Sequence, residues 1–169
     1  MVSGTSGVLR NGKADKPSSK KTLKGFRVSA SRHKKRSVLV MDDDAYVTEL
    51  LCTMLNESGY DACAASNGEE AIQRFTRARA LGRPINTVIL DLNIPAGMGG
   101  SETISKLRDM DPGVRAILLT GDIGHPEITK YRESGFRAAL LKPFTRAELL
   151  QAMNWTSENP SDTDGTHSG

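Results

Sequence analysis

The sequence has few cysteines and no long apolar run, and both absences narrow what the chain can be. Its two cysteines, Cys52 and Cys63, have ten residues between them, a separation that matches neither a zinc-ligand nor a redox spacing. Both lie among apolar residues, which predicts buried free thiols and a reducing compartment. No stretch approaches the roughly 18 apolar residues of a membrane span, and the N-terminus has no apolar signal segment. Together these absences predict a cytoplasmic chain with no membrane contact.

Residues 1–36 are almost without acidic residues and without hydrophobic periodicity. They hold eleven Lys or Arg and a single acid, so their net charge is +10, whereas residues 37–169 carry −7. Such a segment cannot bury enough apolar surface to offset its chain entropy, which predicts a disordered basic N-terminal tail. The run RHKKR at residues 32–36 could contact nucleic acid or an acidic partner, although a solvated leader is the commoner role of such a run. The polar residues 156–169 predict a second, C-terminal disordered tail.

Residues 37–155 alternate apolar strands with amphipathic helices. Strands are predicted at residues 38–41 and 87–91, where residues 38–41 and 88–90 are continuous apolar runs, as expected for strands that are buried on both faces of a sheet. Further strands are predicted at residues 60–65, 114–119 and 137–141, and a helix follows each of the five strands. The helices are expected to begin near Ala45, Gly68, Ser101, Pro126 and Thr145. These spacings require parallel, right-handed crossovers, so the fold class is predicted to be a three-layer α/β domain.

Polar side chains follow four of the five predicted strands. Asp42 and Asp43 come after the first strand, Asp91 ends the third, Thr120 ends the fourth and Lys142 follows the fifth. Because the carboxyl ends of parallel strands share one edge of the sheet, these side chains are expected to converge. Three close carboxylates repel one another unless a cation joins them, and oxygen-only ligands favour Mg²⁺. With a lysine and a hydroxyl beside it, such a site suits a phosphoryl group, which a carboxylate can itself accept.

Four segments carry a resemblance to a known family: VLVMDDD, VILDLNIPAGMGG, ILLTGD and LLKPF. Over about Ser37 to Asn154 the sequence resembles the receiver domain of two-component response regulators. The segments DLNIPAGMGG and DPGVRAILLTGD are similar to those of receivers attached to hybrid sensor histidine kinases. The resemblance implies a flavodoxin-like (βα)5 fold with parallel sheet order 2-1-3-4-5. It also implies a phosphorelay protein that receives a phosphoryl group from a sensor histidine kinase or a histidine phosphotransfer protein. Such a domain is a phosphoacceptor and not an enzyme, apart from self-catalysed phosphorylation and dephosphorylation.

The same resemblance implies roles for the residues that handle the phosphoryl group. Asp91 would be the phosphoacceptor, Lys142 would pair with Asp91 and the phosphoryl oxygens, and Thr120 would bind a phosphoryl oxygen after modification. The bond between Lys142 and Pro143 is expected to be cis. The sequence departs from the family at Ala139, where receivers usually carry Tyr or Phe three residues before the lysine, so the usual aromatic readout is not expected.

The resemblance implies a Mg²⁺ site as well. Asp43 and Asp91 would be direct ligands, joined by the backbone carbonyl of Asn93, while Asp42 would act mainly through water. No other cofactor is implied.

Three alternative readings remain open. A phosphatase resembling the haloacid-dehalogenase family would use Asp42 as nucleophile and Asp44 as acid, but it needs a further acidic pair beyond the lysine and leaves Asp91 without a role. The same fold could also lack phosphoryl chemistry, with Asp91 only capping the loop that follows it. Nucleic-acid binding would rest on residues 1–36 alone, because no helix-turn-helix is recognisable after the receiver, and it would be an addition to the main function.

Overall fold

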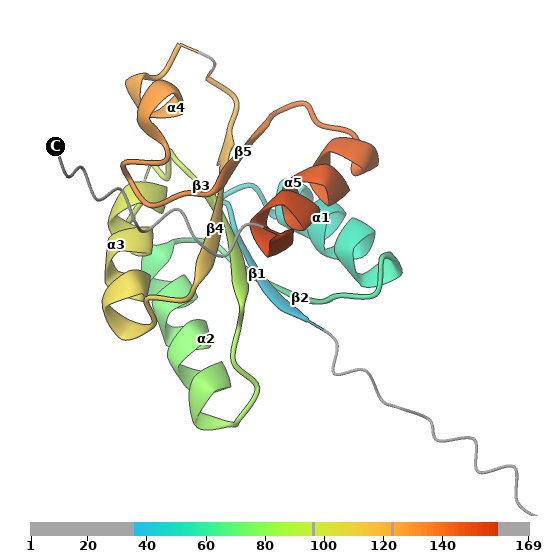
Figure 1. Cartoon of the computed structure of the whole chain (residues 1–169), viewed down its shortest axis with the longest axis vertical. Helices are drawn as coiled ribbons and strands as arrows, with labels where there is room; N and C mark the ends of the chain where they lie inside the picture. Colours follow the sequence, from blue (N-terminus) through green and yellow to red (C-terminus); the bar gives the residue numbers. More distant parts are fainter. Residues whose placement is uncertain (1–35, 96, 123, 159–169) are drawn as a thin grey trace, which may run out of the picture. The chain divides into compact units, whose positions relative to one another are not determined.

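A computed structural model describes residues 36–95, 97–122 and 124–158 of the chain (Figure 1). Residues 1–35 and 159–169, which make up most of the two predicted tails, lie outside the described residues. In the described part, five strands alternate with five helices, as the sequence predicts. Their order is β1 (Ser37–Met41), α1 (Ala45–Glu57), β2 (Asp61–Ala65), α2 (Gly68–Ala80), β3 (Thr87–Asp91), α3 (Gly100–Met110), β4 (Arg115–Thr120), α4 (Pro126–Lys130), β5 (Ala138–Leu141) and α5 (Arg146–Glu158).

The strands form one parallel sheet in the order β2-β1-β3-β4-β5, so the predicted flavodoxin-like α/β fold is confirmed. The register places Met41 opposite Leu90 and Asp91 opposite Leu119. The carboxyl ends of β1, β3 and β4 therefore lie along one edge of the sheet. The polar residues that follow these strands are brought together by this register.

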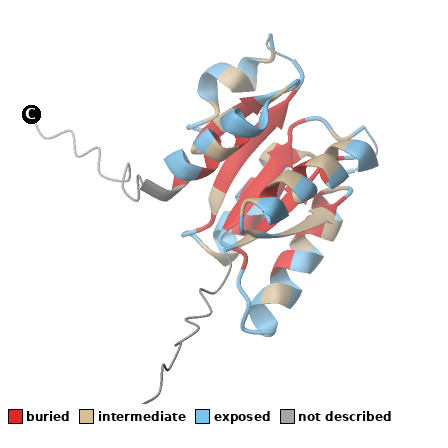
Figure 2. Cartoon of the chain, turned by 90° about the vertical axis from the view of Figure 1, so that its right-hand side faces the viewer, coloured by how far each residue is buried: buried red, intermediate tan, exposed pale blue. Residues whose placement is uncertain are grey.

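The sheet separates two apolar clusters and is buried by helices on both faces (Figure 2). Alternate residues of one strand serve opposite faces: Val88 and Leu90 of β3 join the cluster that includes Phe75 of α2, whereas Ile89 joins the cluster that includes Leu149 of α5. Because both faces are covered, β1 and β3 need apolar side chains at successive positions. This burial explains why their sequences show no polar alternation.

The structure corrects some of the predicted boundaries. Three strands begin one residue later than expected, and α3 begins at Gly100 with Gly99 in the N-cap position, one residue before Ser101. At the C-terminus, α5 runs to Glu158, so residues 156–158 are helical and do not belong to a disordered tail. In this last part of the helix Thr156 is buried, and its hydroxyl donates to the carbonyl oxygen of Met153 at 2.8 Å. Among the described helices, none combines the length and apolarity that a membrane crossing requires.

Candidate functional site

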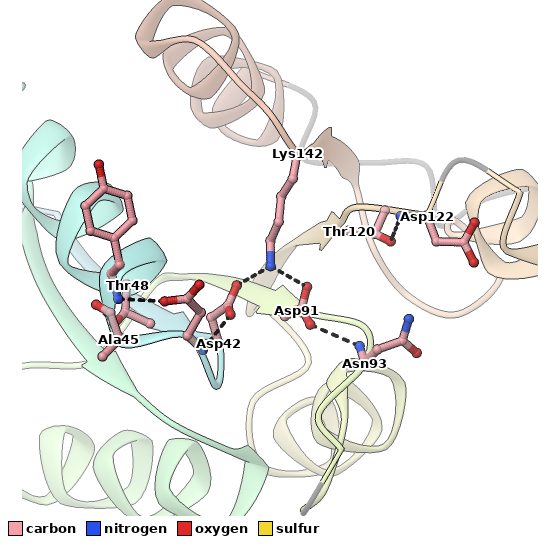
Figure 3. Close-up of polar contacts among 10 residues, drawn as sticks. Asp42, Ala45, Thr48, Asp91, Asn93, Thr120, Asp122 and Lys142 are labelled. Carbon is pink, nitrogen blue, oxygen red and sulfur yellow. Dashed lines mark hydrogen bonds and ion pairs between the residues drawn. The ribbon is translucent and has the colours of Figure 1, made fainter.

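Side chains from three strand ends meet at the carboxyl edge of the sheet (Figure 3). Nζ of Lys142, just after β5, lies 2.5 Å from Oδ2 of Asp42 and 3.0 Å from Oδ1 of Asp91. Asp42 follows β1 and Asp91 ends β3, and the two residues are only 2% and 5% exposed. One ammonium group thus pairs with two buried carboxylates, as expected from the convergence of the strand ends.

The three carboxylates after β1 and at the end of β3 form a group that could hold a metal ion. Asp42, Asp43 and Asp91 each offer an oxygen within 4.8 Å of the other two. All the donors are oxygen atoms, the set that hard divalent cations prefer. Asp42 and Asp91 are buried while Asp43 is exposed, which leaves an open side for the water ligands that Mg²⁺ retains. The donor chemistry of this pocket therefore fits Mg²⁺.

The three consecutive aspartates after β1 have three different positions. Asp42 is buried, and its Oδ1 accepts from the backbone N–H of Asp44 at 3.0 Å. Asp43 is exposed at the rim. Asp44 is the N-cap of α1, where its carboxylate accepts from the N–H of Tyr46 at 2.8 Å. The phosphatase reading needs Asp44 as a general acid, whereas the structure uses its carboxylate to cap a helix.

Other predicted site residues border the same pocket. Thr120 at the end of β4 is 1% exposed, and its hydroxyl oxygen accepts from the N–H of Asp122 at 3.2 Å. The backbone N–H of the exposed Asn93 donates to Oδ2 of Asp91 at 3.2 Å, so the loop after β3 contacts the central carboxylate. The peptide bond between Lys142 and Pro143 is cis, as predicted.

Burial and the neighbouring Lys142 have opposite effects on the pKa of Asp91. Burial raises the pKa of Asp91 above its usual value, with a further rise from the charge of Asp42, and the hydrogen bond and charge of Lys142 offset only part of this. Burial alone would lower the pKa of Lys142, but its hydrogen bonds to Asp42 and Asp91 raise it overall. The raised pKa of Lys142 keeps its ammonium charged at neutral pH, whereas the cost of burying the charged form of Asp91 is only partly compensated.

The backbone of the loop between β3 and α3 is closely packed at two glycines. A Cβ atom on Gly100 would lie 2.7 Å from the carbonyl oxygen of Asp91, and one on Gly99 would lie 2.6 Å from that of Leu92. Glycine at these two positions allows the loop backbone to pass directly over the end of β3.

The sequence did not predict that the start of α2 contacts the loop between β3 and α3. The N–H of Gly68 donates to the carbonyl oxygen of Met98 at 2.9 Å, and Oε2 of Glu69 accepts from the N–H of Met98 at 3.2 Å. The only signal in the sequence was the pair Asn67–Gly68, which was read as the start of a helix. Nothing in the spacing indicated that this helix start contacts a loop some thirty residues later in the chain.

The fold and the acidic pocket at the carboxyl edge of the 2-1-3-4-5 sheet agree with the receiver fold that the sequence resemblance implies. Comparison with known families makes the assignment specific. Residues 38–154 match the response regulator receiver domain, and the chain belongs to this family.

Two curated relatives illustrate the range of proteins that the chain resembles. It is 30% identical over 115 residues to a response regulator receiver protein of Anaeromyxobacter sp. (strain Fw109-5), a match that covers 68% of this chain and 46% of the relative. It is also 30% identical over 116 residues to sporulation initiation phosphotransferase F of Bacillus subtilis (strain 168), covering 69% of this chain and 89% of the relative. The chain thus spans about half the length of the first relative and most of the second.

Solved structures show the same fold. Chemotaxis protein CheY4 of Vibrio cholerae superposes with a TM-score of 0.64 at 24% identity, covering 71% of this chain and 97% of that one. CheY in the CheX–CheY–BeF₃–Mg²⁺ complex of Borrelia burgdorferi superposes with a TM-score of 0.62 at 26% identity, covering 69% of this chain and 85% of that one.

Proposed function

We propose that this receiver accepts a phosphoryl group on Asp91 in a Mg²⁺-dependent phosphorelay. The observation that carries the proposal is the position of the Asp91 carboxylate, which is buried at the end of β3, 3.0 Å from Lys142 and grouped with the oxygens of Asp42 and Asp43. A donor would be a sensor histidine kinase or a histidine phosphotransfer protein. The alternative phosphatase mechanism gives no role to Asp91, although this carboxylate is buried at the end of the central strand.

The proposed transfer moves one phosphoryl group between two side chains. A carboxylate oxygen of Asp91 attacks the phosphorus of a donor phosphohistidine, forming a P–O bond as the P–N bond breaks. The electron pair of the broken bond returns to the imidazole nitrogen, which then takes a proton. The ammonium of Lys142 is placed to attract the phosphoryl oxygens, and the hydroxyl of Thr120, at the neighbouring strand end, would donate to one of them.

The residues proposed to hold Mg²⁺ are Asp43, Asp91 and the backbone carbonyl of Asn93. Both carboxylate oxygens of Asp42 already have partners, because Oδ2 contacts Lys142 and Oδ1 accepts from the N–H of Asp44. This supports an indirect, water-mediated role for Asp42 and a direct one for the exposed Asp43. When bound, Mg²⁺ would offset the negative charge of the carboxylates and of the phosphoryl oxygens.

The test is phosphorylation by a small donor. Wild type incubated with phosphoramidate and Mg²⁺ should give a shifted band on a Phos-tag gel, whereas Asp91→Asn should give none and Asp43→Asn should lose most of the Mg²⁺-supported shift. Asp44→Asn is the matched control, because asparagine also caps a helix and the phosphatase alternative needs an acid there. If Asp91→Asn shifts as fully as wild type, or if Asp44→Asn abolishes the shift, the assignment is wrong.

The localisation, domain organisation and partners of the protein are part of the same proposal. We infer a cytoplasmic protein whose folded receiver, residues 37–155 extended by the last turn of α5, lies between a basic N-terminal and a polar C-terminal tail. The segment DLNIPAGMGG resembles receivers of hybrid sensor kinases, and this resemblance supports descent from such receivers. The occurrence of a Borrelia CheY in a complex with CheX supports signalling through a protein partner. Any contact with nucleic acid would involve the basic tail.

A further inference from the structure

The loop between β3 and α3, described at residues 92–95 and 97–99, has its two ends joined by a hydrogen bond. The N–H of Gly100 donates to the carbonyl oxygen of Leu92 at 3.4 Å, and the close approach of Gly100 to Asp91 leaves no space for a side chain there. The near side of the loop carries Asn93, whose N–H bonds the Asp91 carboxylate. Asn93 and Met98 therefore lie on the two arms of one short loop whose ends are joined.

The far side of the loop is held by the N-terminus of α2. Met98 uses both of its backbone polar groups there: its carbonyl oxygen accepts from Gly68 at 2.9 Å, and its N–H donates to Oε2 of Glu69 at 3.2 Å. Gly68 is buried, and a Cβ on it would lie 2.1 Å from Oγ1 of Thr103 and 2.7 Å from Cβ of Met98. The two backbones can approach this closely only because residue 68 is glycine.

We propose that Glu69 is a positioning residue of the phosphoryl site, acting through Met98 on the loop that carries Asn93. This proposal rests on the proposed function, because it concerns the geometry around Asp91. Glu69 lies in the first turn of α2, where the helix dipole favours a negative charge, and a hydrogen bond to a charged acceptor is stronger than one to a neutral acceptor. The site is thus preorganised from a helix outside the carboxylate cluster.

The next residue, Glu70, provides a matched control. It has the same side chain in the same helical turn, but its carboxylate accepts from the N–H and hydroxyl of Ser66 at 2.8 and 2.9 Å and pairs with Arg74 at 2.7 Å. Glu70 therefore stabilises the start of α2, whereas Glu69 reaches the loop. Replacing each residue separates loop positioning from helix stability.

Isothermal titration of the full chain with Mg²⁺ is the decisive measurement. Removal of a partner that orients a metal ligand typically weakens binding about 10- to 100-fold, so Glu69→Ala, acting one step further away, should weaken it about two- to tenfold. It should also speed hydrogen exchange at the Met98 amide and slow phosphorylation by phosphoramidate at fixed Mg²⁺. Glu69→Gln, whose amide oxygen can accept the same bond, should recover most of the affinity.

The control and the contrary outcomes are distinct. Glu70→Ala should lower the melting temperature at least as much as Glu69→Ala does, yet keep the wild-type Mg²⁺ affinity and Met98 exchange. The inference is overturned if Glu69→Ala binds Mg²⁺ like wild type, or if Glu70→Ala loses as much affinity. Failure of wild type to be phosphorylated at Asp91 would instead overturn the proposed function, and the affinity and exchange data would still decide the role of Glu69.

Discussion

At the scale of single residues, the pocket has an unbalanced charge. Asp42 and Asp91 are both buried, and one ammonium group, that of Lys142, lies within 3.0 Å of both. A carboxylate that is buried without full compensation destabilises the fold and raises its own pKa. The arrangement that equips Asp91 to accept a phosphoryl group should therefore weaken the metal-free domain.

Replacing Asp91 by its neutral isostere should accordingly stabilise the metal-free protein. Burial raises the pKa of Asp91, so ionisation of this group destabilises the folded state. This destabilisation is largest when Asp91 is ionised, and it decreases as the pH falls and the group becomes protonated. Asp91→Asn should raise stability at pH 7 by about 1 kcal/mol, or roughly 3–5 °C, and the gain should shrink towards pH 4. Asp109→Asn, at an exposed position of α3, should change neither value. Melting curves without metal at both pH values test this, and an unchanged or lower melting temperature at pH 7 would contradict it.

The convergence of Asp42, Asp91 and Lys142 could be predicted because it follows from geometry: the carboxyl ends of parallel strands lie at one edge of the sheet. It could not predict how Asp42, Asp43 and Asp44 divide their roles, since three identical neighbours differ only in the direction of their side chains. It also missed Glu69, because the contact with Met98 joins segments that are far apart in the chain and share no pattern.

At the scale of elements, α4 differs from the other helices. It has five residues, against eleven to thirteen in the others. Its apolar contacts to the core come from Ile128 and, just after the helix, Tyr131, both only partly buried. Beside it lies a groove of about 590 Å³ lined by Tyr131, β5 and α5, which includes Ala139 and the half-exposed Trp155. An element with so few buried contacts belongs to the least stable part of a fold and is easily shifted.

Phosphorylation should therefore be relayed through the segment between Thr120 and Lys142. A new phosphoryl group contacts both ends of this segment at once, so α4 and its flanking loops should move without an inward-turning ring at Ala139. Hydrogen exchange with and without beryllofluoride, which mimics the aspartyl phosphate, should show changed protection across residues 121–141. Asp91→Asn treated in the same way is the control and should show no change. Changes confined to residues 91–100 would rule out this route while leaving the acceptor chemistry intact.

Helix and strand order followed from periodicity, since the apolar stripe of each helix and the apolar runs of β1 and β3 face the two clusters in the core. The ends of elements were less predictable. Helix α3 has a glycine in the N-cap position and no side-chain cap. Because serine is a preferred N-cap residue, the sequence predicted that the helix begins near Ser101. The last turn of α5 is polar in sequence, and only the fold reveals that Thr156 is buried.

At the scale of the whole molecule, charge is divided unevenly along the chain. Residues 1–36 carry +10 and residues 37–169 carry −7, so the overall charge of +3 describes neither part. Among the described residues, the first backbone contacts to the sheet come from Arg36, whose carbonyl oxygen accepts from the N–H of Asp61 at 3.0 Å, and Ser37, whose carbonyl oxygen accepts from the N–H of Asn86 at 3.2 Å. The family match begins at residue 38. The receiver should therefore be complete without the residues that precede Arg36.

A chain that starts at Arg36 should fold and be phosphorylated as the full chain is. Its melting temperature at about 0.15 M salt should stay within about 2 °C of the full chain, because attraction between exposed charges is largely screened beyond about 8 Å at that ionic strength. Its rate of phosphorylation by phosphoramidate should be equal, whereas its retention on heparin should fall sharply, because the net positive charge lies in the removed segment. A full chain with Lys34→Glu and Lys35→Glu is the control, and it should lose part of the retention with no change in phosphorylation. A slower reaction or a clear loss of stability in the shortened chain would show that the basic segment supports the receiver itself.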